Sequence, residues 1–217
     1  MSINAILKKS AIPSKEEAIV GRKEAIKITG IHIITKDDMT RQPEKSEAMI
    51  VLGMGCFWGA ERKLWNTKGV KVTAVGYAGG HTENPTYEET CTGQTGHSEV
   101  VKVIYDKTIT SLEEVLQVFW ENHDPTQGMK QGNDIGSQYR SVIYTTSPDQ
   151  TEIVEKSVAS YQQRLIDAGM SMITTEREPL DTFYYAEEYH QQYLHKNPTG
   201  YCGLSGTGVS CPIGLSV

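Results

Sequence analysis

The stretch AMIVLGMGCFWGAERKLWNTKG, residues 48–69, decides the fold of this chain. Residues 48–55 form a continuous apolar run, which is typical of a buried strand. After Cys56, apolar residues recur at helical spacing until Gly69, so the second half of the stretch predicts a helix. We therefore expect Cys56 at the turn where a buried strand leads into a helix.

The segments after this stretch alternate in the same way. Apolar patterns and turn signals predict strands over 70–77, 98–106 and 139–145, and a helix over 112–123 that opens with a capping box. The order β-α-β-β-α-β matches the split β-α-β plan of ferredoxin-like folds, in which two crossover helices cover one face of an antiparallel or mixed sheet. We therefore expect an α+β fold with a ferredoxin-like core.

An extension is expected at each end of this core. Residues 1–45 predict an N-terminal arm with a short helix from Ser14 to Gly21, and residues 197–217 predict a mobile, Gly-rich tail. The core between them covers 46–196, and no internal repeat or Pro/Ser-rich linker divides the chain. We therefore expect a single domain. The last part of the core predicts a helix over 148–168, a strand over 171–178 and an aromatic helix over 182–197.

Charge and composition exclude several classes of partner. The formal net charge of the 217 residues is -6, and the lysines and arginines are scattered, so no basic face is available for nucleic acid or for a membrane surface. No apolar stretch approaches the roughly 20 residues that span a bilayer, and the N-terminus lacks the apolar segment of a signal peptide. We expect a cytoplasmic monomer. Three lysines and no acid in residues 1–15 leave mitochondrial targeting as an alternative.

The four cysteines are too sparse for a disulfide scaffold and lack the CxxC spacing of zinc sites; they are Cys56, Cys91, Cys202 and Cys211. At the start of a helix, Cys56 lies near unpaired N–H groups and the positive end of the helix dipole, which favour the thiolate. This position makes Cys56 a candidate nucleophile. The alternative is a buried cysteine that acts as a small apolar residue.

Two features of the surroundings favour a reactive Cys56. Phe57 and Trp58 cannot both face the core, because adjacent helical positions are about 100° apart, so at least one of them is expected to line a surface pocket. A Gly-rich tail can also deliver the thiols of Cys202 and Cys211 to a sulfur that is oxidised elsewhere. Alternatively, these two thiols are an inert pair in the tail. Cys91 has no such arrangement and is expected to be a packed thiol.

Glu99 is the candidate acid. In its predicted strand it alternates with Val101, Val103 and Tyr105, so its carboxyl should lie on an apolar face with a raised pKa. The alternative is a glutamate at a strand edge that reaches water. Tyr87, Tyr139 and Asp134 could supply hydrogen-bond donors and an orienting carboxylate, although these residue types are also common in turns and at strand starts.

No metal site is expected, because the loop histidines are not grouped with the cysteines at ligand spacing; they are His81, His97 and His123.

Five segments together resemble the A-type peptide methionine sulfoxide reductases: GCFWG, GHSEVVKVIYD, HDPTQGMKQGNDIGSQYRSVIY, FYYAEEYHQQYL and KNPTGYCGLSGTGVSC. The resemblance runs from about Ser14 to the C-terminus, and GCFWG combined with the tail cysteines is highly specific. It implies reduction of the S epimer of methionine sulfoxide, free or in proteins, for protein repair and antioxidant defence. It also implies thioredoxin as the electron donor and no bound cofactor.

The resemblance implies a role for each candidate residue. Cys56 would be the nucleophile, and Phe57 with Trp58 would form the walls of a pocket for the substrate's methyl group. Glu99 would be the acid, and the residues around the sulfoxide oxygen would be Tyr87, Asp134 and Tyr139. Cys56 would become a sulfenic acid, which Cys202 would resolve as a disulfide, and Cys211 would then exchange into that disulfide.

Two other classes of function fit parts of the sequence. A papain-like thiol hydrolase would use His190 or His195 as the base, but it would have no use for the tail cysteines. A non-catalytic protein would bind methionine-bearing segments between Phe57 and Trp58 and would use its tail cysteines to sense oxidation. We prefer the reductase to both.

Overall fold

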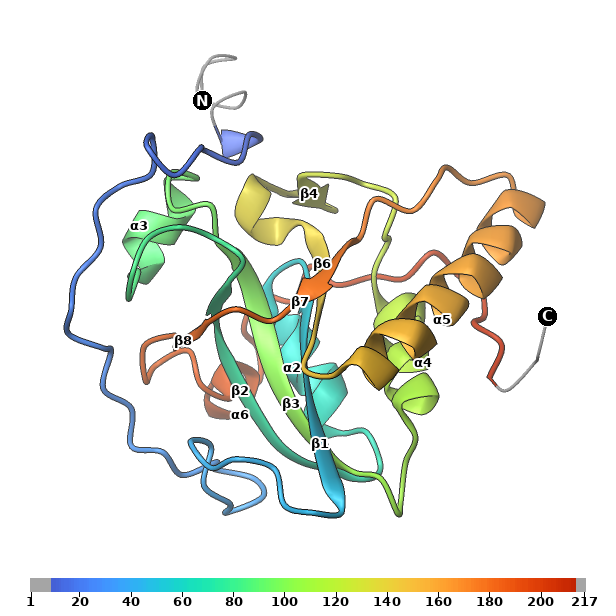
Figure 1. The fold of residues 1–217 in the computed structure, drawn as a ribbon, viewed down its shortest axis with the longest axis horizontal. Helices are drawn as coiled ribbons and strands as arrows, with labels where there is room; N and C mark the ends of the chain where they lie inside the picture. Colours follow the sequence, from blue (N-terminus) through green and yellow to red (C-terminus); the bar gives the residue numbers. More distant parts are fainter. Residues whose placement is uncertain (1–8, 214–217) are drawn as a thin grey trace.

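The structure is a computed structural model that describes residues 9–213, and it has a mixed α/β architecture around one curled sheet (Figure 1). The large sheet has the strand order β7-β6-β1-β3-β2-β8. Its strands are β1 (Glu47–Met54), β2 (Val70–Ala78), β3 (Ser98–Asp106), β6 (Ser141–Thr145), β7 (Glu176–Pro179) and β8 (Phe183–Tyr185). A second, small sheet pairs β4 (Lys130–Gln131) with β5 (Asp134–Ile135). The helices are α2 (Phe57–Trp65), α3 (Tyr87–Cys91), α4 (Leu112–Asn122), α5 (Pro148–Asp167) and α6 (Tyr193–Lys196).

The pairing of the strands confirms the mixed class of the predicted fold. β3 lies between β1 and β2 and is antiparallel to both, and β1 pairs antiparallel with β6 on its other side. The outer strand β7 is parallel to β6, which makes the sheet mixed. Since β1 and β2 are separated by β3, helix α2 has to cross over a strand to join them.

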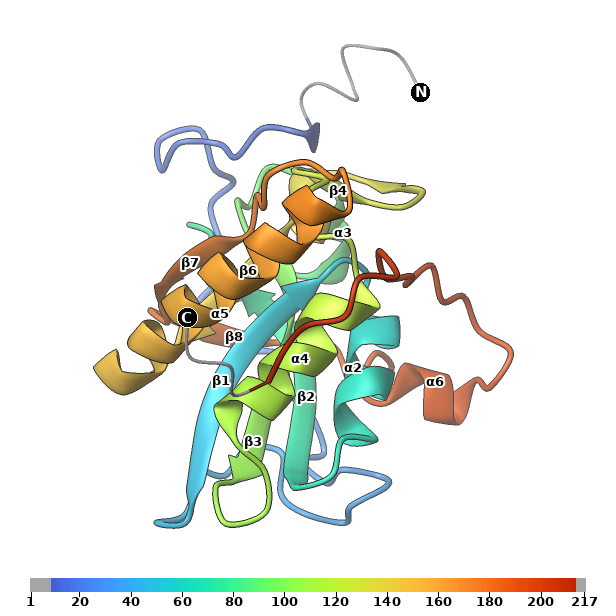
Figure 2. The same ribbon diagram turned by 90° about the vertical axis from the view of Figure 1, so that its right-hand side faces the viewer.

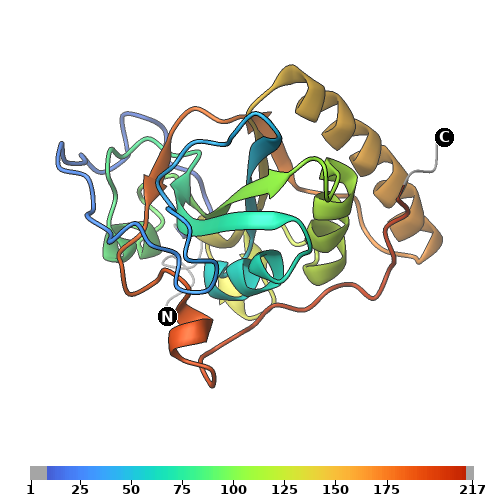
Figure 3. The same cartoon turned by 90° about the horizontal axis from the view of Figure 1, so that it is seen from below.

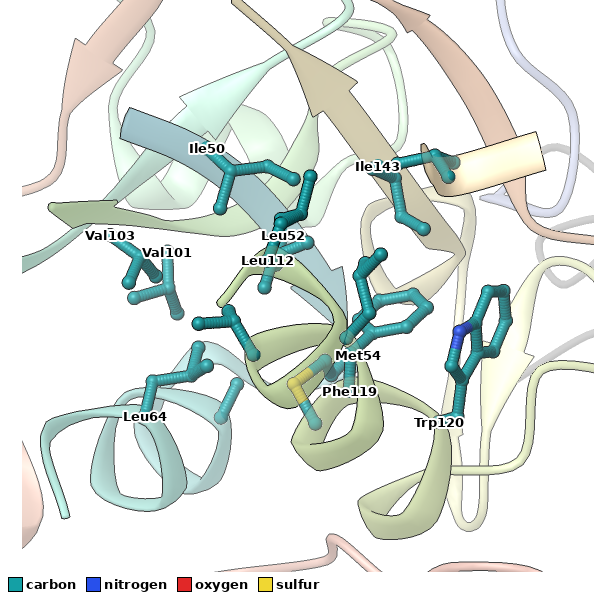
Figure 4. Packing of buried hydrophobic residues seen from close by; sticks show 14 of the residues in the cluster. Ile50, Leu52, Met54, Leu64, Val101, Val103, Leu112, Phe119, Trp120 and Ile143 are labelled. Atoms are coloured by element: carbon teal, nitrogen blue, oxygen red, sulfur yellow. The ribbon is translucent and has the colours of Figure 1, made fainter. Parts of the chain in front are cut away.

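The main core lies between the sheet and the helices α2 and α4, which pack side by side (Figure 2). Leu112, Leu116 and Phe119 of α4 are buried at helical spacing, and alternate residues of β3 point at the helices. Figure 4 shows Leu64 of α2 among these side chains, close to Val101 and Val103 of β3. The face of β3 that carries Glu99 is therefore the face covered by α2.

The N-terminal arm follows the outside of the sheet and is tied to several elements (Figure 3). Arg22 forms an ion pair with Glu89 of α3, and Lys102 of β3 donates from Nζ to the carbonyl oxygen of Met39. The short helix predicted over 14–21 is wrong: a turn at Ser14–Glu17 stands in its place. The arm therefore owes its course to contacts with the core.

The aromatic helix predicted over 182–197 is also wrong. Residues 183–185 form β8, which pairs with the edge strand β2, and a helix begins only at Tyr193. The free edge of β2 offers backbone partners, and this pairing overrides the helical spacing of the aromatic residues. The strand predicted over 171–178 begins only at Glu176.

Residues 197–213 form an extended segment that crosses α4 (Figure 2). The hydroxyl groups of Tyr161 and Thr207 lie 2.9 Å apart, and the Tyr161 hydroxyl also lies 3.1 Å from the carbonyl oxygen of Val209. The tail is thus docked on the helical layer.

None of the helices within residues 9–213 combines the length and the apolar character that a membrane span requires.

Candidate active site

Cys56 lies at the turn between β1 and α2, as the sequence predicts. The turn depends on Gly55, whose φ of 93° is in the left-handed region, and a Cβ at this position would lie 2.6 Å from the side chain of Gln131. Cys56 is the N-cap residue of α2 and is half-buried. The strand end and the helix start thus place the thiol at the edge of the core.

The thiol of Cys56 is in its protonated form at neutral pH. Burial, followed by the nearby Glu99 carboxyl, raises the pKa of Cys56 well above its ordinary value. The backbone N–H groups of Trp58 and Gly59 lower the pKa, as expected at a helix start, but they do not outweigh burial. The helix start thus favours the thiolate in the predicted direction, while burial has the larger effect on the pKa of Cys56.

Glu99 is 1% exposed and lies in the middle of the sheet, on β3 opposite Tyr77. Burial raises the pKa of Glu99 to about 8, although the N–H of Phe57 donates to Oε2 at 3.0 Å and lowers it. The carboxyl therefore holds its proton at neutral pH. The predicted raised pKa is confirmed, and the alternative of a strand-edge glutamate that reaches water is wrong.

Phe57 and Trp58 divide between the core and the surface. Phe57 is 1% exposed, while Trp58 is half-buried. The indole Nε1 of Trp58 donates to Nδ1 of His190 at 2.9 Å, and its ring stacks on Tyr193 with the centroids 3.9 Å apart. Trp58 is therefore the more accessible of the two aromatic residues.

His190 is fully buried among the aromatic residues of the site, with its ring centroid 5.0 Å from that of Phe57 and 4.5 Å from that of Tyr87. Burial lowers the pKa of His190 to about 4, so the ring is neutral. Its Nδ1 is occupied by the Trp58 indole, and its Nε2 has no hydrogen-bond partner among residues 9–213. His195 is exposed. His190 is not arranged as a base for Cys56, because its Nδ1 already accepts a hydrogen bond, so the hydrolase interpretation loses this candidate base.

Tyr87 and Tyr139 are both close enough to Glu99 for its charge to affect them. Burial and then Glu99 raise the pKa of each tyrosine, so both hydroxyl groups remain donors. Tyr87 opens α3, and its N–H donates to Oε1 of Glu187 at 2.8 Å. The other oxygen of Glu187 accepts from the hydroxyl of Tyr77 at 2.9 Å. Sequence reasoning missed Glu187 and Tyr77, since their only local signal is the aromatic and acidic composition of their segments.

Asp134 belongs to β5 and connects the small sheet to the tail. Burial raises the pKa of Asp134, while the hydroxyl of Tyr201, 3.2 Å from both carboxylate oxygens, lowers it. Tyr201 directly precedes Cys202, and sequence reasoning also missed it. The contact therefore fixes the tail next to the first tail cysteine.

All four cysteines are free thiols, and the two tail cysteines lie in different places. Cys202 lies against the first turn of α2: a Cβ added to Gly59 would come within 3.0 Å of its Sγ. Cys211 is buried against α4, where its N–H donates to Oε1 of Glu121 at 2.8 Å, and burial raises its pKa to about 12. The structure thus brings Cys202 to the helix that begins at Cys56, but it places Cys211 elsewhere.

Cys91 is the last residue of α3 and is half-buried beside Tyr87. Burial raises the pKa of Cys91, so it is a thiol at neutral pH.

Comparisons with known proteins give one consistent result. The family model "Peptide methionine sulfoxide reductase" matches residues 48–209. The peptide methionine sulfoxide reductase MsrA of Brucella anthropi is 55% identical over 214 residues, which are 99% of this chain and 98% of that protein. The MsrA of Agrobacterium fabrum is 56% identical over 212 residues, 97% of this chain and 98% of that protein.

Two solved structures agree with these relatives. Methionine sulfoxide reductase A of Corynebacterium diphtheriae has a TM-score of 0.84 and 43% identity, covering 93% of this chain and 98% of that one. Mxr1 from Saccharomyces cerevisiae in reduced form has a TM-score of 0.67 and 36% identity, covering 75% of this chain and 93% of that one.

Proposed function

The chain belongs to the peptide methionine sulfoxide reductase family and is an oxidoreductase that reduces methionine sulfoxide; we propose that it reduces the S epimer, free or in proteins, with Cys56 as nucleophile and Glu99 as acid. The observation that carries this proposal is the hydrogen bond from Phe57 N–H to Glu99, which holds a protonated carboxyl next to the residue that follows Cys56. We also propose that the enzyme acts as a monomer.

The chemistry explains why an acid is needed. A sulfoxide oxygen can leave only if it is protonated or strongly hydrogen-bonded. Glu99 supplies that proton while Cys56 attacks the sulfur and passes its own thiol proton to Glu99, and the S–O bond of the substrate breaks. The attack joins the Cys56 sulfur to the substrate sulfur, and the oxygen departs as water once Glu99 has passed on the thiol proton as well. Water then adds to the Cys56 sulfur as this S–S bond breaks and returns a proton to Glu99, which leaves Cys56 as a sulfenic acid and releases methionine. Because Tyr87 and Tyr139 remain protonated, they can stabilise charge that develops on the oxygen.

Phe57 and Trp58 form the walls for the methyl group next to the attacked sulfur. The half-buried position of Trp58 supports this assignment, as does its fixed orientation between His190 and Tyr193. Asp134 orients the site from the side of the tail through its contact with Tyr201.

Recycling proceeds through the two tail cysteines. Cys202 condenses with the sulfenic acid of Cys56 to give a disulfide and water, and its position against Gly59 supports this role. Cys211 then exchanges into the disulfide, which requires it to leave its contact with Glu121. Thioredoxin in the cytoplasm reduces the resulting bond between Cys202 and Cys211.

An enantiomer assay tests the reaction. Racemic methyl aryl sulfoxide is incubated with the protein and dithiothreitol, and the remaining sulfoxide is separated on a chiral column. We expect loss of the S form only, and no loss with the Cys56→Ser variant. Consumption of both forms, or activity in Cys56→Ser, would contradict the proposal.

Variants of the tail cysteines test the relay. With thioredoxin as reductant, Cys202→Ser should reduce about one sulfoxide per enzyme and stop with Cys56 oxidised. Cys211→Ser should form the disulfide between Cys56 and Cys202 but recycle slowly. Full turnover of Cys202→Ser with thioredoxin would refute the relay.

A further inference from the structure

Glu61 of α2 is a fully buried carboxyl that the proposed reaction does not use. Three donors point at it. Thr73 donates from Oγ1 to Oε1 at 3.0 Å, Gln192 donates from Nε2 to the same oxygen at 2.8 Å, and the backbone N–H of Gln192 donates to Oε2 at 2.8 Å. Glu61 therefore acts as an acceptor that joins three groups from two other segments of the chain.

One of these donors leads on to the N-terminal arm. Nδ1 of His32 accepts from the N–H groups of Ile34 and Thr35, both at 3.2 Å, so the ring proton is on Nε2. Nε2 then donates to Thr73 at 2.9 Å, which leaves the hydroxyl proton of Thr73 for Glu61. Burial lowers the pKa of His32 to about 4, so this ring is neutral. Each hydrogen bond in this chain therefore has one direction: His32 in the N-terminal arm donates to Thr73, and Thr73 donates to Glu61.

The other two donors belong to Gln192, which lies in the left-handed region with a φ of 47°. This conformation is unfavourable for a residue with a side chain and persists where contacts hold it. The preceding residue is held as well, because the side-chain amide of Gln191 pairs with both the N–H and the carbonyl oxygen of Val75 at 2.9 Å. Two consecutive glutamines therefore fix the path of the chain.

The residues on either side of these glutamines hold the Trp58 indole. His190 accepts its N–H at 2.9 Å, and Tyr193 stacks on its ring at 3.9 Å with an interplanar angle of 16°. Since Glu61 and Trp58 are on the same helix, the bonds from Glu61 to Gln192 tie both partners of the indole to the helix that carries it.

We propose that Glu61 is a positioning residue for the substrate site: it anchors residues 190–193 to α2 so that His190 and Tyr193 hold the Trp58 indole in one orientation. The inference rests on the proposed function in one respect, the assignment of Trp58 to the methyl pocket. Loss of the anchor should release the indole and weaken substrate binding, while the chemical step at Cys56 is little changed once substrate is bound.

The experiment reads the indole directly and the kinetics separately. The chain has three tryptophans, so a nitrogen–proton correlation spectrum shows three indole signals, and Trp58→Phe assigns one of them. In Glu61→Ala, the Trp58 signal should shift and broaden. The signal of Trp120, whose indole donates to Ser157 at 2.9 Å, should stay in place. The KM for methionine sulfoxide should rise about tenfold, with a smaller change in the single-turnover rate at saturation.

Three further variants make the test specific. Glu61→Gln keeps the volume and part of the bonding and should give a smaller shift of the Trp58 signal. Glu47→Gln removes a carboxyl of β1 that pairs with Arg41, and it should leave both the Trp58 signal and KM unchanged. If Glu61→Ala fails to fold, Gln192→Ala tests the same anchor, because it removes the side-chain donor to Glu61.

The outcomes separate this inference from the proposed function. An unmoved Trp58 signal in the folded Glu61 variants overturns the inference, whatever happens to KM. A shifted signal with unchanged KM supports the anchoring role and contradicts the assignment of Trp58 to the methyl pocket.

Discussion

Two carboxyls, those of Glu99 and Glu61, are buried to a similar degree and differ in how many hydrogen bonds they accept. Glu99 is 1% exposed and Glu61 is 0% exposed, and burial raises their pKa values to about 8 and about 7. Within residues 9–213, Glu99 accepts one hydrogen bond, from Phe57, whereas Glu61 accepts three. Burial alone therefore does not identify an acid: a carboxyl with few donors is free to give up a proton to a substrate, while one with filled acceptor sites joins parts of the fold.

The neighbours of the two carboxyls make the same distinction. Glu99 lies close to the half-buried Cys56 and affects the pKa values of Tyr87 and Tyr139. Glu61 contacts Thr73 and Gln192, which carry no charge. The first group has the components of proton transfer, and the second has those of a structural junction.

The largest expected effect is on the rate of the first step in Glu99→Gln. The amide can still accept from Phe57 N–H but has no proton to give, so the single-turnover rate should fall by roughly 10²–10⁴-fold while substrate binding is kept. The rate is measured by rapid quenching at saturating sulfoxide. The single-turnover rate of Glu61→Gln should fall by less than about tenfold under the same conditions. An unchanged rate in Glu99→Gln would remove Glu99 from the mechanism.

The stability of the same two variants should differ in its dependence on pH. Burial raises the pKa of Glu99 from 4.5 to about 8. The buried carboxyl therefore destabilises the wild-type fold wherever it would be ionised in the unfolded chain. This destabilisation is absent below pH 4.5, grows up to about pH 8 and is constant above. Glu99→Gln should nearly match the wild type at pH 5 and exceed its free energy of unfolding by a few kcal/mol at pH 8. Urea denaturation at both pH values measures this difference.

Glu61→Gln is expected to behave differently at pH 5. At pH 5 the wild-type carboxyl is protonated and carries one hydrogen, whereas the amide carries two and would face donors from Thr73 or Gln192. One buried donor without an acceptor costs about 1–3 kcal/mol. Equal unfolding free energies for the two variants at pH 5 would show that the number of donors does not distinguish the two carboxyls.

The smallest expected effect is that of Thr73→Val. It removes one of the three donors to Glu61 and leaves His32 Nε2–H without its acceptor, so unfolding should become easier by about 1 kcal/mol. The single-turnover rate at saturating sulfoxide should be that of the wild type. A loss as large as that of Glu61→Ala would mean that Thr73, and not Gln192, carries the anchor.

Much of the site could be predicted because its signals are local. The apolar run and the spacing after Cys56 predict the strand, the turn and the helix, and alternation along β3 predicts the face on which Glu99 lies. The ionisation of Cys56 could be predicted only in part, because the helix start is a local feature while burial depends on the whole core. The sequence similarly places Cys202 and Cys211 on the same Gly-rich tail but does not reveal that one lies at α2 and the other at α4.

The sequence by itself determined the strands β1, β2, β3 and β6 with the helices α2 and α4, the position of Cys56 and the segments that identify the family. These depend on periodicity, caps and glycines, which act over a few residues. Tertiary structure alone decided the course of residues 182–197 and the partners of Glu61 and His190. Gln192 is bonded to a carboxyl 131 positions away, and no pattern within its own segment contains that partner. The pKa values of the site follow the same rule, since desolvation depends on every element that packs around a group.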